Sequence, residues 1–351
     1  MKYNYLEVFR GFMALWVVLF HGFAFLPILP KNIVLKFLNN GFLPVAAFVF
    51  LSGFVTYILL EKKESYLFYI KRRAYRLFPI YIVALIISVL MLGLSFDVLN
   101  NLPFDNPKIQ MRLRLISEAE NNFFLNIVSH LGLVHGLFPN ERFPFTYTLM
   151  GQSWSLTLEW QFYIFIPVIY KAYTSRKVIY VALSLLMIPA MIWSFFYMPQ
   201  KSFLPNMIHY FLIGFFSYPL FKVYLKEGKY YLFYFLIISA LLFSFYNIGV
   251  AVMILLFASI LALQKIRPRF AELFFNNKHL LNLGKISYSI YCIHMIVYYL
   301  VGWVLVKIKI NDVFLFSLLF IALGSVITIL LSNFTYTYIE NKFIKLGKKT
   351  S

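Results

Sequence analysis

Two ionisable side chains, Arg10 and His21, stand in the first apolar segment of the chain, where charge is costly. They are eleven residues apart, and over that interval a helix turns to within about 20° of three full turns. Both side chains therefore lie on one helix face, about 16 Å apart along its axis. The pair predicts an arginine at the inner membrane surface and a histidine a little beyond mid-membrane, both of them candidates for a functional role. A snorkelling arginine anchor and a histidine bonded to a neighbouring helix fit the same spacing.

Basic residues also gather at the start of the third apolar segment, where Arg73 and Arg76 are three positions apart and share a helix face. A guanidinium group binds phosphate through two parallel hydrogen bonds. The pair therefore predicts a site for an anionic cofactor. Lys71 and Arg72 are explained by the excess of basic residues on the cytoplasmic side of membrane proteins.

Glu159 is the only acidic residue that the sequence places well inside an apolar segment. If its helix enters from the outer surface near Ser153, Glu159 lies about 9 Å deep, and His21 lies about 12 Å below its own outer end. At matching depths a carboxylate can orient a histidine and raise its basicity. We therefore predict that Glu159 supports His21, with a buried ion pair to Arg10 or another cation as the alternative.

Other polar residues in apolar segments receive supporting roles. His294 falls near mid-membrane, and Tyr288 and Tyr291 lie loosely on its side of the same helix. Ser52 and Gly53 mark a close approach of two helices or of a ligand chain, because small residues let backbones meet.

The usual sequence signatures of other enzyme classes are missing from the chain. His130 and His135 have no Cys or Glu at metal-ligand spacing, so we predict no metal site. The sequence also holds no phosphate-binding glycine loop and no HExxH or GxSxG motif.

The composition indicates the elements that must position these residues. Of the 351 residues, 62% are hydrophobic and only 13% are charged, about half the charge of a soluble domain. A water-soluble protein is excluded, and the length suits about ten membrane spans. Although the net charge is +19, we predict no nucleic-acid partner, because Lys and Arg lie between the apolar segments and do not form one basic patch. A single cysteine, Cys292, excludes a disulfide framework.

The expected fold is an all-α, polytopic membrane bundle that forms one domain over residues 1–351. The predicted spans are 9–29, 43–60, 77–96, 153–170, 178–197, 205–221, 230–246, 249–264, 282–306 and 313–338. With the N-terminus inside, most Lys and Arg residues lie on the inner side, so both termini are predicted to be cytoplasmic. Residues 97–152 then form a large outer loop, in which 123–139 is an interfacial or re-entrant helix. We expect no appended soluble domain.

Six sequence motifs in chain order resemble those of the acyltransferase-3 membrane acyltransferases of bacteria. Phe9 to His21 is similar to the family's Arg-x10-His motif, and Val49 to Phe54 to its Phe-Leu-Ser-Gly-Phe signature. Arg73 to Tyr81 resembles the Arg-x-x-Arg-x-x-Pro-x-Tyr segment, and Ser153 to Pro167 the Trp-Ser-Leu-x-x-Glu-x-x-Phe-Tyr signature. Leu283 to His294 and Tyr336 to Glu340 resemble the two late motifs. Trp160 departs from the family, since many members have a second Glu there, and Met295 replaces a frequent Pro.

The resemblance implies an enzyme that moves an acyl group, most often acetyl, from cytoplasmic acyl-CoA to a surface glycan or its lipid-linked precursor. The implied site has His21 as base or acyl carrier beside Glu159, and the other assigned residues bind the donor or support the site. Donor binding is assigned to Arg10, Arg73, Arg76, Ser52 and Gly53, and the supporting or substrate-contacting roles to Trp154, Tyr288, Tyr291 and His294. The implied location is the bacterial cytoplasmic membrane.

A glycan transporter or flippase is the competing class, since about ten spans with buried charges suit both. Many transporters contain a pseudo-repeat that relates the two halves of the chain, and this sequence shows none. A cluster of arginines at the inner surface also favours a donor that carries phosphate. The identity of the acyl group, the acceptor hydroxyl and the oligomeric state are not predicted.

Overall fold

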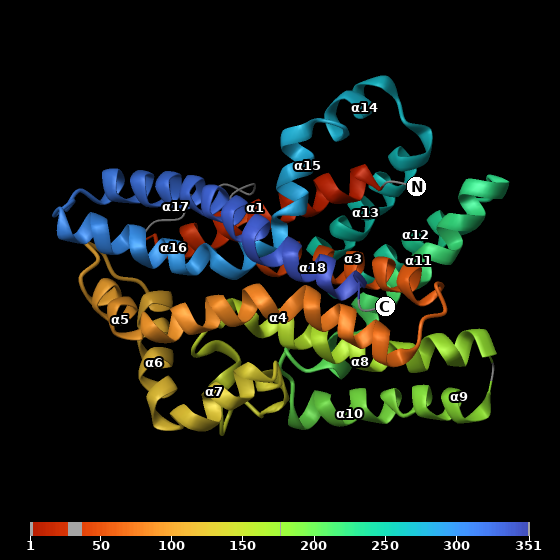
Figure 1. Ribbon diagram of the computed structural model, residues 1–351, viewed down its shortest axis with the longest axis horizontal. Coiled ribbons are helices and arrows are strands. Elements are labelled where there is room, and N and C mark those ends of the chain that lie inside the picture. Colours follow the sequence, from red (N-terminus) through yellow and green to blue (C-terminus); the bar gives the residue numbers. More distant parts are fainter. Residues whose placement is uncertain (1–2, 27–36, 176, 350–351) are drawn as a thin grey trace. The chain divides into compact units, whose positions relative to one another are not determined.

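Almost every residue in the described part of the chain lies in a helix (Figure 1). The computed structural model describes residues 3–26, 37–175 and 177–349, and these ranges contain no β-strand. The predicted all-α class is therefore confirmed. The end of the first predicted span, residues 27–29, lies outside the described residues.

Among the described residues, eight helices or runs of continuous helices are long and apolar enough to cross a membrane. They are α1 (Asn4–Ala24), α3 (Phe42–Leu60), α4 (Tyr66–Leu90), α9 and α10 (Val178–Leu185 and Met187–Tyr197), α11 (Leu204–Glu227), α13 (Ile248–Ile266), α16 (Ser287–Lys307) and the last helical stretch, Val313–Lys348. The other two predicted spans are helices as well. These are α8 (Trp154–Ser175), whose first half is rich in polar side chains, and α12 (Tyr231–Ser244), which has 14 residues.

Large apolar side chains face outward along many of these helices. In α9 and α10 the only buried residue is Ser194, while Val178 and Phe195 are more than two-thirds exposed. In water such a surface would be unfavourable, since exposed apolar area costs free energy in proportion to its size. The arrangement therefore fits helices that face the hydrocarbon core of a bilayer.

The chain divides into two compact units, which are described separately here. The first unit comprises residues 1–20, 30–63 and 209–288, and the second comprises 21–29, 64–208 and 289–351. In the first unit, α12 packs along α13, and α13 packs on α3. Two short helices, α14 (Arg269–Phe275) and α15 (Lys278–Lys285), precede α16.

Small residues set the closest helix contact of the first unit. A Cβ atom on Gly53 of α3 would lie 2.1 Å from the carbonyl oxygen of Phe211 on α11. On the facing helix, a Cβ atom on Gly214 would lie 1.8 Å from the carbonyl oxygen of Phe50. Both distances are far below van der Waals contact, so α3 and α11 can approach this closely only with glycine at both positions.

In the second unit, α4 and α8 run side by side, and α17 (Val313–Thr335) lies along α16 (Figure 1). The backbone then passes through a π-helical turn, η4 (Tyr336–Glu340), into α18 (Asn341–Lys349), which packs on α4. Between α4 and α8, the expected outer loop is itself helical. It contains α5 (Leu92–Asn100), α6 (Pro107–Asn121), α7 (Phe123–Leu131) and the 3-10 turns η1 (His135–Leu137), η2 (Pro144–Tyr147) and η3 (Gly151–Ser153).

The segment 123–139 begins with α7, which has only nine residues. A helix of that length spans about 14 Å, roughly half the hydrocarbon thickness of a bilayer. The chain turns directly after it, where Leu133 has a φ of 52°. This segment is therefore not an eleventh helical span, in line with the prediction of an interfacial or re-entrant helix.

Candidate active site

The first and the ninth of the predicted spans bring two histidines together in the second unit. His21, near the end of α1, lies with its Nδ1 atom 3.2 Å from Nε2 of His294 on α16. The two ring centroids are 4.8 Å apart and the rings are tilted by 53°. His294 is fully buried, whereas His21 is partly exposed. The structure thus joins the predicted catalytic residue to a residue that was assigned only a supporting role.

The backbone of α16 fixes the proton positions of this pair. Nδ1 of His294 lies 3.1 Å from the carbonyl oxygen of Ile290 and 2.9 Å from that of Tyr291. A carbonyl oxygen only accepts hydrogen bonds, so Nδ1 of His294 carries the proton. A second proton on Nε2 would place a charge on a fully buried ring, which is costly. Nε2 of His294 therefore accepts, and Nδ1 of His21 donates.

The consequence for His21 follows from the same tautomer argument. A neutral imidazole has one donor and one acceptor nitrogen. With its proton on Nδ1, His21 has its lone pair on Nε2. A nitrogen lone pair is what a general base or a nucleophile needs, so Nε2 of His21 is the candidate reactive atom of the pair.

Glycines hold α1 close to α16 beside this hydrogen bond. A Cβ atom on Gly22 would lie 2.5 Å from the hydroxyl oxygen of Tyr298, four residues beyond His294. On the other side of that ring, a Cβ atom on Gly324 of α17 would lie 2.4 Å from a ring carbon. The Tyr298 ring is fully buried and so cannot swing away from either contact. Glycine at position 22 is therefore part of what brings His21 within reach of His294.

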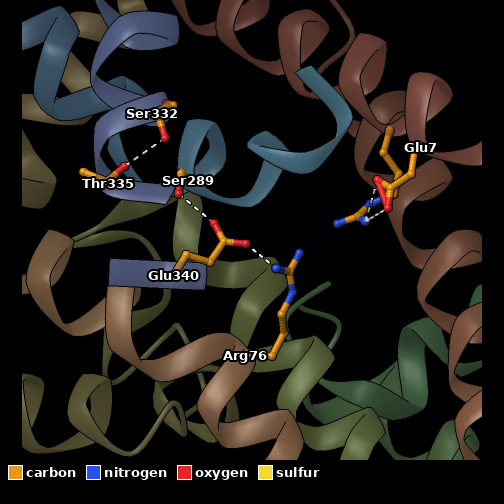
Figure 2. A network of polar contacts seen from close by, with 7 residues as sticks. Glu7, Arg76, Ser289, Ser332, Thr335 and Glu340 are labelled. Carbon is orange, nitrogen blue, oxygen red and sulfur yellow. Dashed lines mark hydrogen bonds and ion pairs between the residues drawn. The ribbon is translucent and has the colours of Figure 1, made fainter. Parts of the chain in front are cut away.

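A second polar cluster lies where α4, α16 and the π-turn meet. Arg76 forms an ion pair with Oε1 of Glu340, and Oγ of Ser289 donates a hydrogen bond of 2.6 Å to Oε2 (Figure 2). Glu340 is 1% exposed. A buried carboxylate needs such partners, because moving an unpaired charge out of water costs on the order of several kcal/mol. The predicted phosphate-binding residue Arg76 therefore neutralises a carboxylate of its own chain.

Glu340 also corrects a prediction. The sequence placed Glu159 as the only acidic residue well inside a span, because the last span was ended at residue 338. The helix in fact continues through the π-turn, and Glu340 is buried within the stretch Val313–Lys348. Single π-turns inside helices often occur at functional sites, because they re-aim one side chain.

The predicted residues Glu159 and Arg73 meet through Tyr163. The hydroxyl of Tyr163 donates a hydrogen bond to Glu159 one turn earlier on α8. The guanidinium of Arg73 lies 5.4 Å from the centroid of the Tyr163 ring, within the range of a cation–π contact. Nε of Arg73 is buried without a hydrogen-bond partner among the described residues. Unlike Arg76, Arg73 takes part in none of the ion pairs between described residues.

Tyr291 ties α16 to the start of α8. Its hydroxyl donates to the carbonyl oxygen of Gln152 at 2.7 Å, so the hydroxyl of Ser155 must be the donor in the 2.6 Å bond to Tyr291. Trp154, half-buried, is the first residue of α8 and lies between these two partners in the sequence. Tyr291 thus positions the turn from which Trp154 projects.

The remaining predicted residues lie in the first unit. Arg10 forms an ion pair with Glu7 at 3.3 Å, and both side chains are partly exposed. Gly53 occupies the close contact between α3 and α11 described above, and Ser52 precedes it on α3. Tyr288 is buried near the start of α16. Arg10 is therefore the one donor-binding candidate of this unit with a charge, and that charge is shared with Glu7.

His130 and His135 stack in the outer segment of the second unit, with ring centroids 4.0 Å apart. Burial lowers the pKa of His130 to about 4. Burial and the neighbouring His130 hold the pKa of His135 well below its ordinary value. Neutral rings suit this site, because Nε2 of His130 and Nδ1 of His135 are buried without a hydrogen-bond partner among the described residues, and a protonated ring needs an acceptor at both nitrogens. Among the described residues, no three His, Cys, Asp or Glu side chains group so as to hold a metal ion.

Comparison with known proteins identifies the family. The sequence model of the acyltransferase-3 family, described as an acyltransferase domain, matches residues 3–336. The chain belongs to the acyltransferase-3 family. Searches of curated proteins and of solved structures gave no match. The match and the apolar helices together make the chain a membrane acyltransferase.

Several residues of the candidate site were not assigned from the sequence. Ser289 and Glu340 lie in the late family motifs, yet their partnership with Arg76 depends on how three distant helices pack. Gly22 gives a weak signal, since a glycine directly after a histidine in an apolar helix is a position where helices can approach. Tyr163 gives a stronger one, because it is four residues after Glu159 and so shares its helix face.

Proposed function

We propose that the chain transfers an acyl group, in the simplest case acetyl, from cytoplasmic acyl-CoA to a hydroxyl of a cell-surface polysaccharide or of its lipid-linked precursor. The observation that carries this proposal is the hydrogen bond from His21 to the buried, backbone-locked His294. We assign the protein to the bacterial cytoplasmic membrane with both termini inside, as the distribution of Lys and Arg indicates.

In the proposed reaction, Nε2 of His21 takes the proton of the acceptor hydroxyl while the hydroxyl oxygen attacks the thioester carbonyl. The C–S bond of the tetrahedral intermediate then breaks, and the departing thiolate takes the proton from the imidazolium. The products are an O-acyl ester and free coenzyme A. If Nε2 instead attacks the carbonyl, the C–S bond breaks, the thiolate of coenzyme A leaves and an acyl-imidazole forms. The acceptor hydroxyl then takes the acyl group and regenerates His21, and its proton ends on the thiolate. The same nitrogen reacts in both routes.

For the donor, Arg73 is the strongest candidate to bind a phosphate. Its charge has no carboxylate partner among the described residues, whereas Glu340 neutralises Arg76. We propose that Arg76 holds the π-turn in place and that Arg73 contacts the donor. For Arg10, Ser52 and Gly53 of the first unit, donor binding stays a prediction from the family resemblance. Glu159 contributes through Tyr163, because its carboxylate accepts a hydrogen bond from the Tyr163 hydroxyl and the Tyr163 ring contacts the guanidinium of Arg73. Trp154, Tyr288 and Tyr291 are assigned to the acceptor or to support of the site.

The test compares a strain without the gene with strains restored by wild type, His21→Ala or His279→Ala. His279 is an exposed histidine of α15 and serves as the matched control. The O-acyl content of the surface polysaccharides is measured by proton NMR at equal membrane levels of each variant. We expect an ester signal that disappears in the deletion and returns with wild type and His279→Ala, but not with His21→Ala.

Two results would overturn parts of this proposal. Full rescue by His21→Ala would remove the catalytic assignment. Intact esters in the deletion strain, together with glycan trapped inside the cell, would replace acyl transfer to a glycan by transport. Intact-mass measurement after incubation with acetyl-CoA alone separates the two chemical routes, because only an acyl-imidazole adds the mass of the acyl group to the protein.

A further inference from the structure

A partly open hollow in the second unit has no role in the mechanism above. It is a cavity on the protein surface lined by residues of α4, α5, α6, α16 and the segment 149–152. Met295 and Ile296, the two residues that follow His294, form part of its wall. A ligand that contacts these two residues would therefore lie within one helical turn of His294 along α16.

The position of the cavity along α16 separates it from the Arg76 cluster. Ser289, His294 and Tyr299 follow one another at intervals of five residues, or about 7.5 Å along the helix axis. Ser289 bonds to Glu340 of the Arg76 cluster, His294 bonds to His21, and Tyr299 lines the cavity. The histidine pair thus lies midway along α16 between the Arg76 cluster and a separate cavity.

Arg112 of α6 is the only charged residue that lines the cavity. Its Nε donates to the hydroxyl of Tyr299 at 3.0 Å, and its Nη1 donates to the carbonyl oxygen of Tyr147. Gly151 makes room for it, since a Cβ atom there would lie 3.1 Å from Nη1. No ion pair between described residues includes Arg112. A half-buried guanidinium that is held by neutral groups, without a carboxylate, favours an anion from outside the chain.

The other polar groups of the cavity suit hydroxyl groups. Nε2 of Gln152 donates to the carbonyl oxygen of Cys292 at 3.1 Å, which leaves the side-chain oxygen of Gln152 to accept a further bond. The hydroxyl of Tyr299 accepts from Arg112 and so retains its own proton to donate. Ser88 and Ser95 add two hydroxyls to the lining. Donors and acceptors beside one cation match a sugar that carries an acidic group.

We propose that this cavity binds the acceptor, and that Arg112 recognises an anionic group on it. The anion is either the carboxylate of a sugar acid or the phosphate of a lipid carrier, because a guanidinium fork binds both in the same way. The assignment to the acceptor rests on the proposed function, whereas the anion site itself rests on Arg112 and its surroundings. Flexible methionines in the wall allow the cavity to adapt to a bulkier ligand.

Binding is measured on the full chain in nanodiscs of phosphatidylcholine, with no acyl donor present. The probes are trigalacturonate for the carboxylate, decaprenyl phosphate for the phosphate and maltotriose as the neutral sugar. We expect wild type to bind one of the two anionic probes at least about tenfold more tightly than maltotriose. The anionic probe that binds identifies the source of the charge.

Three variants test the role of Arg112. Arg112→Gln should raise the Kd of the anionic probe about 10- to 100-fold, as expected for loss of charge-assisted hydrogen bonds. Arg112→Lys, which keeps the charge but not the fork, should fall between that variant and wild type. Arg114→Gln, an exposed arginine of the same helix, is the matched control and should bind as wild type does.

Equal binding of the anionic and neutral probes by wild type would overturn the inference, as would an unchanged Kd in Arg112→Gln. If Arg112→Gln fails to fold, the wild-type protein still tests the anion site. The anionic probe should then bind more tightly than maltotriose, and added salt should weaken its binding. Because no donor is present, the result is independent of acyl transfer. A chain that esterifies neutral and anionic acceptors equally well would refute the anion site and leave the proposed function standing.

Discussion

Replacing His294 with phenylalanine removes the hydrogen-bond acceptor of His21 while a ring of similar size still fills the buried site. The neutral hydrogen bond of 3.2 Å contributes about 1 kcal/mol. Loss of the acceptor also exposes the Nδ1–H group of His21 to a desolvation cost of about 1–2 kcal/mol. His21 can avoid that cost by changing its tautomer or rotamer, and either change takes the Nε2 lone pair out of position.

The total of about 2–3 kcal/mol corresponds to a loss of about 30- to 150-fold in kcat. His294→Gln should recover part of this loss, because the glutamine side-chain oxygen can accept a hydrogen bond where Nε2 of histidine did. Acyl transfer from acetyl-CoA is assayed with the purified chain in nanodiscs, and kcat is separated from the KM of acetyl-CoA. We expect kcat to fall and KM to change little, since the lost bond orients the reactive atom and makes no donor contact.

The substitution His279→Gln, on the exposed face of α15, controls for histidine replacement in general. The reasoning is refuted if His294→Phe keeps wild-type kcat, since His21 would then need no acceptor at Nδ1. It is also refuted if glutamine and phenylalanine at position 294 behave alike, because packing and not hydrogen bonding would then be the role of His294.

Three further outcomes are expected. Glu340→Gln should destabilise the protein by about 3 kcal/mol, because it leaves Arg76 without its buried partner. Adding Arg76→Gln should restore part of the lost thermal midpoint. Equal midpoints for the single and double variants would contradict this. Gly22→Ala should lower the free energy of unfolding by about 1–3 kcal/mol and slow acyl transfer, because the added Cβ meets the hydroxyl of Tyr298. Adding Tyr298→Phe removes that hydroxyl and should recover part of the rate. Burial lowers the pKa of His130 to about 4 from 6.5, so the stabilisation of the segment 123–139 by the neutral ring is at its maximum above pH 6.5. That stabilisation should decrease by up to about 3 kcal/mol as pH falls to about 4, as seen in amide hydrogen exchange, and His130→Gln should flatten the dependence.

Local sequence properties determined the class of this protein and the positions of its helices. Apolar runs long enough to span a bilayer are visible without any contact information, and each of the ten predicted spans is largely helical over the residues that the structure describes. Helix ends were less certain, because hydropathy decreases before the backbone hydrogen bonds end. The last predicted span stopped at residue 338, whereas the helical stretch continues to Lys348 and takes Glu340 into the interior.

Residue types and spacings also indicated much of the candidate site, since a histidine or an arginine in an apolar helix is costly and stands out. Such a signal names single residues and not their partners. His21 and His294 are 273 positions apart, and Arg76 and Glu340 are 264 apart. No periodicity of one helix relates residues on different helices, so the pairing depends on how the helices pack, down to the glycines that allow contact. Only the tertiary structure therefore decided that His294 orients His21, and that Glu340 neutralises Arg76.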